Sequence, residues 1–265
     1  MYICKFCSFD VSRYNSAIAV LSINTCGVKM PLTLYYITDG PPGPPSVACR
    51  MLLKAMNIDC NYVKMDFLKG DHLTEEYAKK NPQKEIPVLD DDGFYLSEST
   101  AILQYLADKY GKNDTFYPKD VKARAIVNQR LAFNATRYYR YIEDYILPLF
   151  FDYERTDLMS KKVHVVLDTF NTYLERLGTK YAAGDNLTIA DLQFIGGTMC
   201  LEAIAFDFSS YSHVTKWYNT FKRDNPELWK IADEAKEILI MVSKERPDLS
   251  TLYPHPVHPI RLTKA

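Results

Sequence analysis

Several residue types are scarce in this sequence, and each scarcity excludes a class of protein. Six cysteines in 265 residues are too few for a scaffold held together by disulfides. Ten glycines and 14 prolines are too few for a collagen-like or low-complexity chain. Positive charge is not in excess, with 32 lysines and arginines against 33 aspartates and glutamates, which argues against a nucleic-acid partner. No apolar run approaches the roughly 18 residues of a membrane span, so no membrane partner is expected.

The composition that remains is that of an ordinary globular protein. At roughly 150 residues per domain, the length indicates about two domains. Apolar residues make up 47% and charged residues 25% of the chain, which is usual for a protein in water. The 20 tyrosines and 13 phenylalanines favour either apolar clefts with hydroxyl-bearing walls or well-packed cores. We expect a cytoplasmic protein with reduced thiols.

The first 29 residues predict a loose extension of uncertain order. Cys4 and Cys7 have the CxxC spacing, but only three residues precede them, too few for the strand that a redox motif requires. A second pair of ligands at zinc spacing is not evident, so no metal is expected. The apolar run at 17–23 follows Asp10 and is very short for a secretion signal.

Residues 31–110 predict a small α/β domain. Apolar and β-branched patterns predict four strands at 32–37, 60–67, 85–90 and 94–96, and three helices at 47–57, 74–80 and 97–110. Asp91, Asp92 and Gly93 form the turn between the last two strands. The order is βαβ, a crossing segment, and then ββα, which makes a thioredoxin-like domain.

After a polar linker at 111–120, the pattern is helical throughout. We predict a long helix over 121–153 that Pro148 can kink, followed by helices at 163–177, 189–205, 214–224 and 228–242. Thr188 and Asp191 are a capping signature with a structural role. The fold class is therefore α/β plus all-α, with an all-helical domain at 121–244 and a proline-rich tail at 245–265.

Three segments in this order resemble the cytosolic glutathione transferases over about residues 31–243. They are NPQKEIPVL at 81–89, LSESTAI at 96–102 and LTIAD at 187–191. The segments KGDHLTEEY at 69–77 and YPKD at 117–120, ahead of Arg124, are similar to the insect delta and epsilon classes and nearer to epsilon. The resemblance implies a homodimer with glutathione as co-substrate.

The resemblance also implies a set of glutathione-binding residues. Ile86 and Pro87 offer an extended backbone edge, and this proline is cis in the family. Glu98 and Ser99 lie at a strand-to-helix junction, where free N–H groups hold a carboxylate. The alternative is that Ser97 or Ser99 only caps the helix and that Glu98 favours its dipole. The full set is His72, Lys84, Ile86, Pro87, Glu98, Ser99 and Thr100. His72 and Lys84 match positions at the glycyl end, where Lys84 replaces the histidine usual in the epsilon class.

The chain departs from the family at the catalytic position. In these classes a serine after the first strand donates a hydrogen bond to the glutathione sulfur, but here Gly43 or Gly40 stands at its place. Ser46, at the start of the next helix, is our first candidate for the missing hydroxyl, unless it only caps that helix. The other candidates are Thr38, Tyr35, Tyr36 and backbone amides. Cys49, inside the helix, is expected to be buried core.

The second substrate is expected against the long helix and the segment 203–208. The implied residues are Phe133, Arg137, Tyr138, Tyr141, Ile142, Phe206 and Phe208. The alternative is that this stripe, which continues to Tyr145, is helix–helix core. Arg137 and Arg140 indicate either a polar or anionic end of the ligand or simple exposure.

We predict a glutathione transferase that joins the glutathione thiolate to apolar electrophiles, in detoxification of xenobiotics or on an endogenous substrate. The first alternative is a glutathione-dependent carrier of hydrophobic ligands with weak turnover, favoured by glycine at the serine position. The second is an interaction module, since this fold is also reused in assemblies.

Overall fold

The computed structural model describes residues 32–38, 43–252 and 254–260. The predicted extension over 1–29, its cysteine pair and Gly40 lie outside the described residues. So do the last five positions of the predicted tail.

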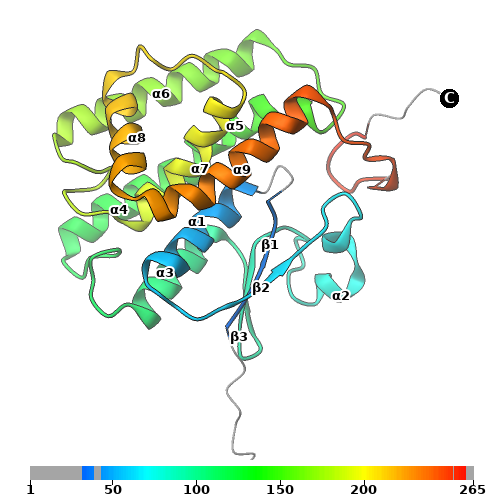
Figure 1. The fold of residues 1–265 in the computed structure, drawn as a ribbon, viewed down its shortest axis with the longest axis horizontal. Coiled ribbons are helices and arrows are strands. Elements are labelled where there is room, and N and C mark those ends of the chain that lie inside the picture. Colours follow the sequence, from blue (N-terminus) through cyan, green and yellow to red (C-terminus); the bar gives the residue numbers. More distant parts are fainter. Residues whose placement is uncertain (1–31, 39–42, 253, 261–265) are drawn as a thin grey trace, which may run out of the picture. The chain divides into compact units, whose positions relative to one another are not determined.

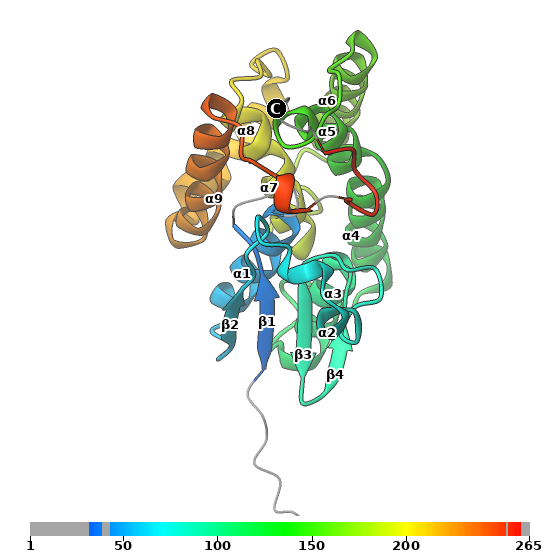
Figure 2. The ribbon, with the colours of Figure 1, turned by 90° about the vertical axis from the view of Figure 1, so that its right-hand side faces the viewer.

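The first part of the chain contains a four-stranded mixed sheet. The strands are β1 (Thr33–Tyr36), β2 (Asn61–Lys64), β3 (Val88–Asp91) and β4 (Phe94–Leu96), in the order β2-β1-β3-β4. β1 pairs with β2 in parallel, while the β1–β3 and β3–β4 pairs are antiparallel, and Figure 2 shows the strands in this order. The helical elements are α1 (Gly43–Ala55), the 3-10 turn η1 (Asp71–Leu73), α2 (Glu75–Ala78) and α3 (Ser99–Tyr110). This confirms the predicted thioredoxin-like order.

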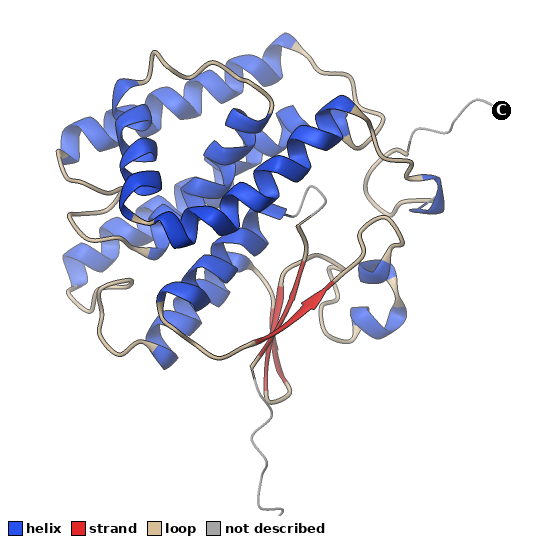
Figure 3. Cartoon of the chain, in the orientation of Figure 1, coloured by secondary structure: helices blue, strands red, loops and turns tan. Residues whose placement is uncertain are grey.

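The rest of the described chain is helical, as predicted (Figure 3). The helices are α4 (Val121–Phe133), α5 (Tyr139–Ile146), α6 (Asp157–Leu177), α7 (Ile189–Ala203), α8 (Ser212–Asp224) and α9 (Pro226–Lys244). The single helix predicted over 121–153 is divided by a π-turn at Asn134–Tyr138 and ends in a 3-10 turn at Leu147–Leu149. Pro148 lies in that 3-10 turn, where its missing N–H interrupts helical hydrogen bonding.

Helix α7 lies at the centre of this part and packs on both α1 and α9 (Figure 1). All of its residues except Glu202 are buried. The predicted capping box is present: Asp191 accepts from the Thr188 amide at 2.9 Å and the Thr188 hydroxyl at 3.1 Å. A Cβ on Gly196 would lie 2.9 Å from the Pro44 Cβ, so only glycine lets α7 approach the start of α1 this closely.

Residues 249–252 and 254–260, the C-terminal strap, return from α9 to the N-terminal part of the chain (Figure 2). The Thr251 hydroxyl donates to the Leu68 carbonyl at 2.6 Å, and the Asp152 amide donates to the Pro259 carbonyl at 2.9 Å. The Leu252 side chain packs over Gly70, where a Cβ would lie 2.9 Å from its Cδ2. The proline-rich segment is therefore a packed element.

Two further observations concern the burial of a cysteine and the character of the described helices. Cys49 is fully buried, as predicted for a core residue. Over the residues described, no helix combines the length and apolar character that crossing a membrane requires.

Candidate functional site

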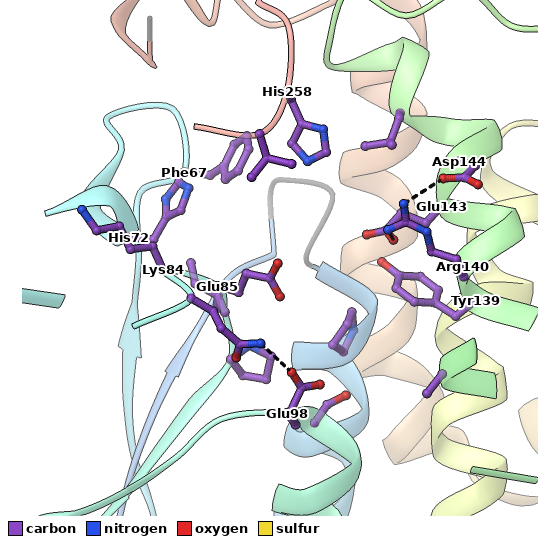
Figure 4. A pocket seen from close by; sticks show the side chains of 18 of the residues that line it. Phe67, His72, Lys84, Glu85, Glu98, Tyr139, Arg140, Glu143, Asp144 and His258 are labelled. Carbon is purple, nitrogen blue, oxygen red and sulfur yellow. Dashed lines mark hydrogen bonds and ion pairs between the residues drawn. The ribbon is translucent and has the colours of Figure 1, made fainter. Parts of the chain in front are cut away.

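A cavity of about 520 Å³ lies between the sheet domain and the helices (Figure 4). Its walls come from the start of α1, the loop that carries η1, the segment before β3, the start of α3, helix α5 and the strap. All seven predicted glutathione-binding residues line this one cavity, namely His72, Lys84, Ile86, Pro87, Glu98, Ser99 and Thr100.

The segment before β3 supplies an extended edge. The peptide bond between Ile86 and Pro87 is cis. The Tyr77 hydroxyl and the Asn81 side-chain amide both donate to the Glu85 carbonyl, at 3.0 and 2.8 Å. The ladder between β1 and β3 begins only at Val88. The polar groups of Ile86 therefore lie outside that ladder and can pair with the backbone of a peptide.

The start of α3 forms the opposite end of this edge. Glu98 precedes the first turn with a φ of 65°, which is unusual for a residue with a side chain, and it makes no side-chain capping bond. Its carboxylate accepts instead from the Gln83 amide at 3.2 Å. The Gln193 amide of α7 donates to the Ser99 hydroxyl at 3.0 Å. The Glu98 side chain thus leaves the first N–H groups of α3 available for an anion.

His72 and Lys84 lie on the side of η1. His72 is 4% exposed and stacks on Phe67 with ring centres 5.0 Å apart. Burial, with His255 nearby, lowers its pKa to about 4, so the imidazole is neutral at pH 7. Its Nδ1 is buried and has no hydrogen-bond partner among the described residues. The Lys84 ammonium donates to the Glu75 carboxylate at 2.8 Å, which partly neutralises it.

The structure corrects the expectation for Ser46. This residue is fully buried and is not among the described residues that line the cavity, and its hydroxyl oxygen accepts from the Ile37 amide at 3.3 Å. The other hydroxyl candidates, Thr38, Tyr35 and Tyr36, are also absent from the described residues that line the cavity. From α1 the cavity is reached by Pro45, while Gly43 is buried at the first position of that helix.

The expected apolar-substrate residues also need correction, because none of the seven is among the described lining residues. Phe133, Tyr138 and Ile142 belong to the helix–helix core; Tyr138 packs edge-on against Phe194 of α7 at 4.9 Å. Arg137 is exposed, and Tyr141 lies under Lys162.

Phe206 packs on Tyr145 at 5.5 Å, and Phe208 packs on Tyr218 at 6.0 Å. The cavity is lined instead by another face of the segment 134–147. The cavity face is Ala135, Tyr139, Arg140, Glu143, Asp144 and Leu147.

This face of α5 carries charge, as Figure 4 shows. Arg140 pairs with Glu143 at 3.4 Å and with Asp144 at 3.5 Å. Burial raises the pKa of Glu143 to about 7; Glu85 and Asp144 add to the rise, and Arg140 opposes it. The wall therefore changes its net charge near neutral pH. The spacing of four between Tyr139 and Glu143 was the sequence signal for this face.

The strap adds residues that the sequence did not suggest. His255, Pro256, Val257 and His258 line the cavity. The His258 ring stacks on Phe151 at 4.4 Å, and its Nδ1 lies 3.1 Å from the Tyr153 hydroxyl. Burial, His255 and Arg140 lower the pKa of His258 to about 4. Within the described ranges, no group of three or more metal-ligating side chains could hold a metal ion.

Comparison with known proteins agrees with this geometry. The model of the glutathione S-transferase N-terminal domain matches residues 30–108, and that of the C-terminal domain matches residues 142–225. A diazinon-metabolizing glutathione S-transferase of the silkworm Bombyx mori is 51% identical; the match covers 80% of this chain and 100% of that one, with a TM-score of 0.74.

Two further solved structures come from the two insect classes. A Nilaparvata lugens delta-class glutathione transferase is 37% identical over 81% of this chain and 99% of its own, with a TM-score of 0.75. An epsilon-class glutathione S-transferase of the housefly Musca domestica is 34% identical over 81% of this chain and 98% of its own, with a TM-score of 0.74. With both domains matched and such relatives, this chain belongs to the glutathione S-transferase family.

Proposed function

We propose that this transferase binds glutathione in the described cavity and transfers its thiolate to apolar electrophiles. The observation that carries the proposal is the convergence of the seven predicted residues on one cavity. The cysteinyl backbone pairs with Ile86, and the γ-glutamyl end lies at Glu98 and the start of α3. The glycyl end lies beside His72.

The thiolate then lies between the start of α1 and the facing wall of α5. Pro44 and Pro45 have no N–H, so only the Gly43 and Ser46 amides remain in the first turn of α1. On α5 the Tyr139 side chain points into the cavity (Figure 4). Burial raises the pKa of Tyr139 well above its usual value, so the hydroxyl stays protonated and can donate. We assign this hydroxyl to the thiolate, in place of Ser46.

The second substrate lies over Leu147, Phe151 and Met159, the apolar part of the lining. Arg140 and Glu143 border this part and suit a substrate with a polar end. Since the Bombyx mori relative is named for diazinon metabolism, apolar xenobiotics of that kind are the proposed electrophiles.

The experiment is to measure the pKa of bound glutathione from ultraviolet thiolate absorbance against pH. A free thiol titrates near 8.5, and we expect the bound thiol to titrate at least about one unit lower, worth about 1.4 kcal/mol. Tyr139→Phe should raise that pKa and slow conjugation at pH 6.5. A lowered pKa unaffected by this substitution would refute the role of Tyr139.

One observation favours a second function, a glutathione-dependent carrier with weak turnover: Gly43 has no hydroxyl, and the buried Ser46 is not among the described residues that line the cavity. Glutathione that binds with an unshifted thiol pKa would favour the carrier. A homodimer and a cytoplasmic location belong to the same proposal. Light scattering of the purified chain and microscopy of the tagged protein would test them.

A further inference from the structure

The strap and the loop that carries His72 form one packed unit. Thr251 bonds to Leu68, and Leu252 packs over Gly70, both just ahead of His72 in the chain. From there a row of rings leads across the cavity wall. Phe67 stacks on His72, Phe151 lies edge-on to Phe67 at 6.3 Å, and His255 lies 5.2 Å from Phe151. Whatever binds beside His72 therefore meets the strap.

The proton position on His255 follows from its hydrogen bonds. The amides of Val257 and His258 both donate to His255 Nδ1, at 3.2 and 2.8 Å. A nitrogen that accepts two N–H groups carries no proton, so the neutral ring holds its proton on Nε2. No hydrogen bond of His255 Nε2 is found within the described residues. His255 thus presents a fixed N–H donor on a residue that lines the cavity.

His72 has a matching need. Its ring is more than nine-tenths buried on the cavity wall, and its Nδ1 has no partner among the described residues. Lys84, which lines the same cavity, is engaged by Glu75. A carboxylate at this end of the cavity can then be met by imidazole N–H groups.

We propose that His255 is a further glutathione-binding residue, whose Nε2–H joins His72 in holding the glycyl carboxylate. The strap then completes the co-substrate site. This inference rests on the proposed function, because it assumes that the glycyl end lies beside His72.

The charges around the pair lead to a second expectation. Asp71 is the charged neighbour of His72. His258 is the neighbour of His255, and Arg140 acts in turn on His258. Burial lowers the pKa of both His72 and His255 in the free protein. A bound carboxylate favours the charged form of an imidazole, so glutathione binding near pH 6 should take up protons.

The test compares glutathione with its glycyl ethyl ester, in which a neutral ester replaces that carboxylate, by calorimetric titration of the full chain. His255→Asn keeps an oxygen close to the position of Nδ1 for the two amides but removes the Nε2 donor. His255→Gln places an amide N–H near that donor. His258→Phe is the matched control, since it alters a neighbouring ring of the strap that stacks on the same Phe151.

We expect His255→Asn to weaken glutathione binding about tenfold, as for one hydrogen bond to a charged group, and to leave ester binding unchanged. His255→Gln should recover most of the loss, and His258→Phe should leave the ratio of the two affinities as in wild type. Proton uptake, from titrations in buffers of different ionisation enthalpy, should fall in His255→Asn.

Equal weakening of both ligands, or no weakening of either, would overturn the role of His255 while wild-type glutathione binding upheld the proposed function. A wild-type chain that binds neither ligand would overturn both. Thermal unfolding of each variant identifies any loss of folding. If a variant does not fold, the proton uptake of the wild-type chain decides, and an absence of proton uptake on glutathione binding would reject the inference.

Discussion

Introducing a serine at Gly43 is the sharpest perturbation that the structure offers. A Cβ built on Gly43 has the Thr38 carbonyl oxygen as its nearest neighbour, at 3.6 Å, which is an ordinary contact. The backbone of Gly43 is helical, without a left-handed φ. Gly43→Ser should therefore fold normally and place a hydroxyl at the start of α1, at one of the two positions, Gly43 and Gly40, where the family serine is expected.

The size of the effect follows from one hydrogen bond to an anion. Such a bond contributes about 1.5–3 kcal/mol, and one pKa unit corresponds to about 1.4 kcal/mol, so the pKa of the bound thiol should fall by about one to two units. Thiolate absorbance against pH at saturating glutathione measures it. Gly43→Ala adds the same Cβ without the hydroxyl and is the matched control.

The reasoning is refuted if the serine and alanine variants give the same thiol pKa with intact thermal unfolding. The sulfur would then not lie beside Gly43, and Gly43 would be rejected as the position that matches the family serine, which leaves Gly40. If the thiol pKa falls only in the serine variant and conjugation at pH 6.5 becomes faster, the natural chain has room for a hydroxyl at position 43 but works without one there.

Three further predictions follow from buried charges. Burial raises the pKa of Glu143 to about 7, so inhibition by an anionic dye should weaken from pH 6 to pH 8 as the carboxyl ionises. Glu143→Gln should flatten that pH profile, and an unchanged profile would contradict the role of Glu143. The buried Asp191 accepts from the Ala182 amide, Thr188 and the Trp217 indole. Asp191→Ala should therefore lower the free energy of unfolding by about 3 kcal/mol in urea titrations. A loss of only about 1 kcal/mol, as for an exposed helix cap, would argue that burial of these bonds adds nothing. Burial raises the pKa of Asp91, but hydrogen bonds from Lys109, Tyr105 and Tyr110 outweigh this effect and hold the pKa at about 2. The stabilisation that follows is complete above the unfolded pKa of about 3.9 and is lost as pH falls toward 2. The stability of Asp91→Asn should therefore depend less on pH in that range, as measured by acid unfolding.

Local pattern was sufficient for most of the fold. Alternation and turn residues placed all four strands, and the strong capping pair at Thr188 placed the start of α7. The divided helix was not predictable in this way. The π-turn at Asn134–Tyr138 has no proline or glycine to mark it, and it depends on how α4 and α5 pack on α7.

The site was predicted unevenly for a physical reason. Residues on the sheet side came from contiguous motifs, and all of them line the cavity. From the π-turn into α5, two adjacent faces both carry aromatic residues, and periodicity cannot tell which face meets the core. Tyr138 faces the core, and Tyr139 lines the cavity. The strap has no periodicity, and its histidines reach the cavity through contacts more than 180 residues apart in the chain, such as Thr251 with Leu68.

The close approach of Gly196 to Pro44 has a consequence for how the molecule folds. The first turn of α1 packs directly against the backbone of α7, and the described residues form one compact unit. Neither the sheet domain nor the helical domain should then be a separate cooperative folding unit. The sheet domain expressed alone would expose the start of α1. Calorimetry of the full chain should therefore show one unfolding transition for the two domains together instead of two.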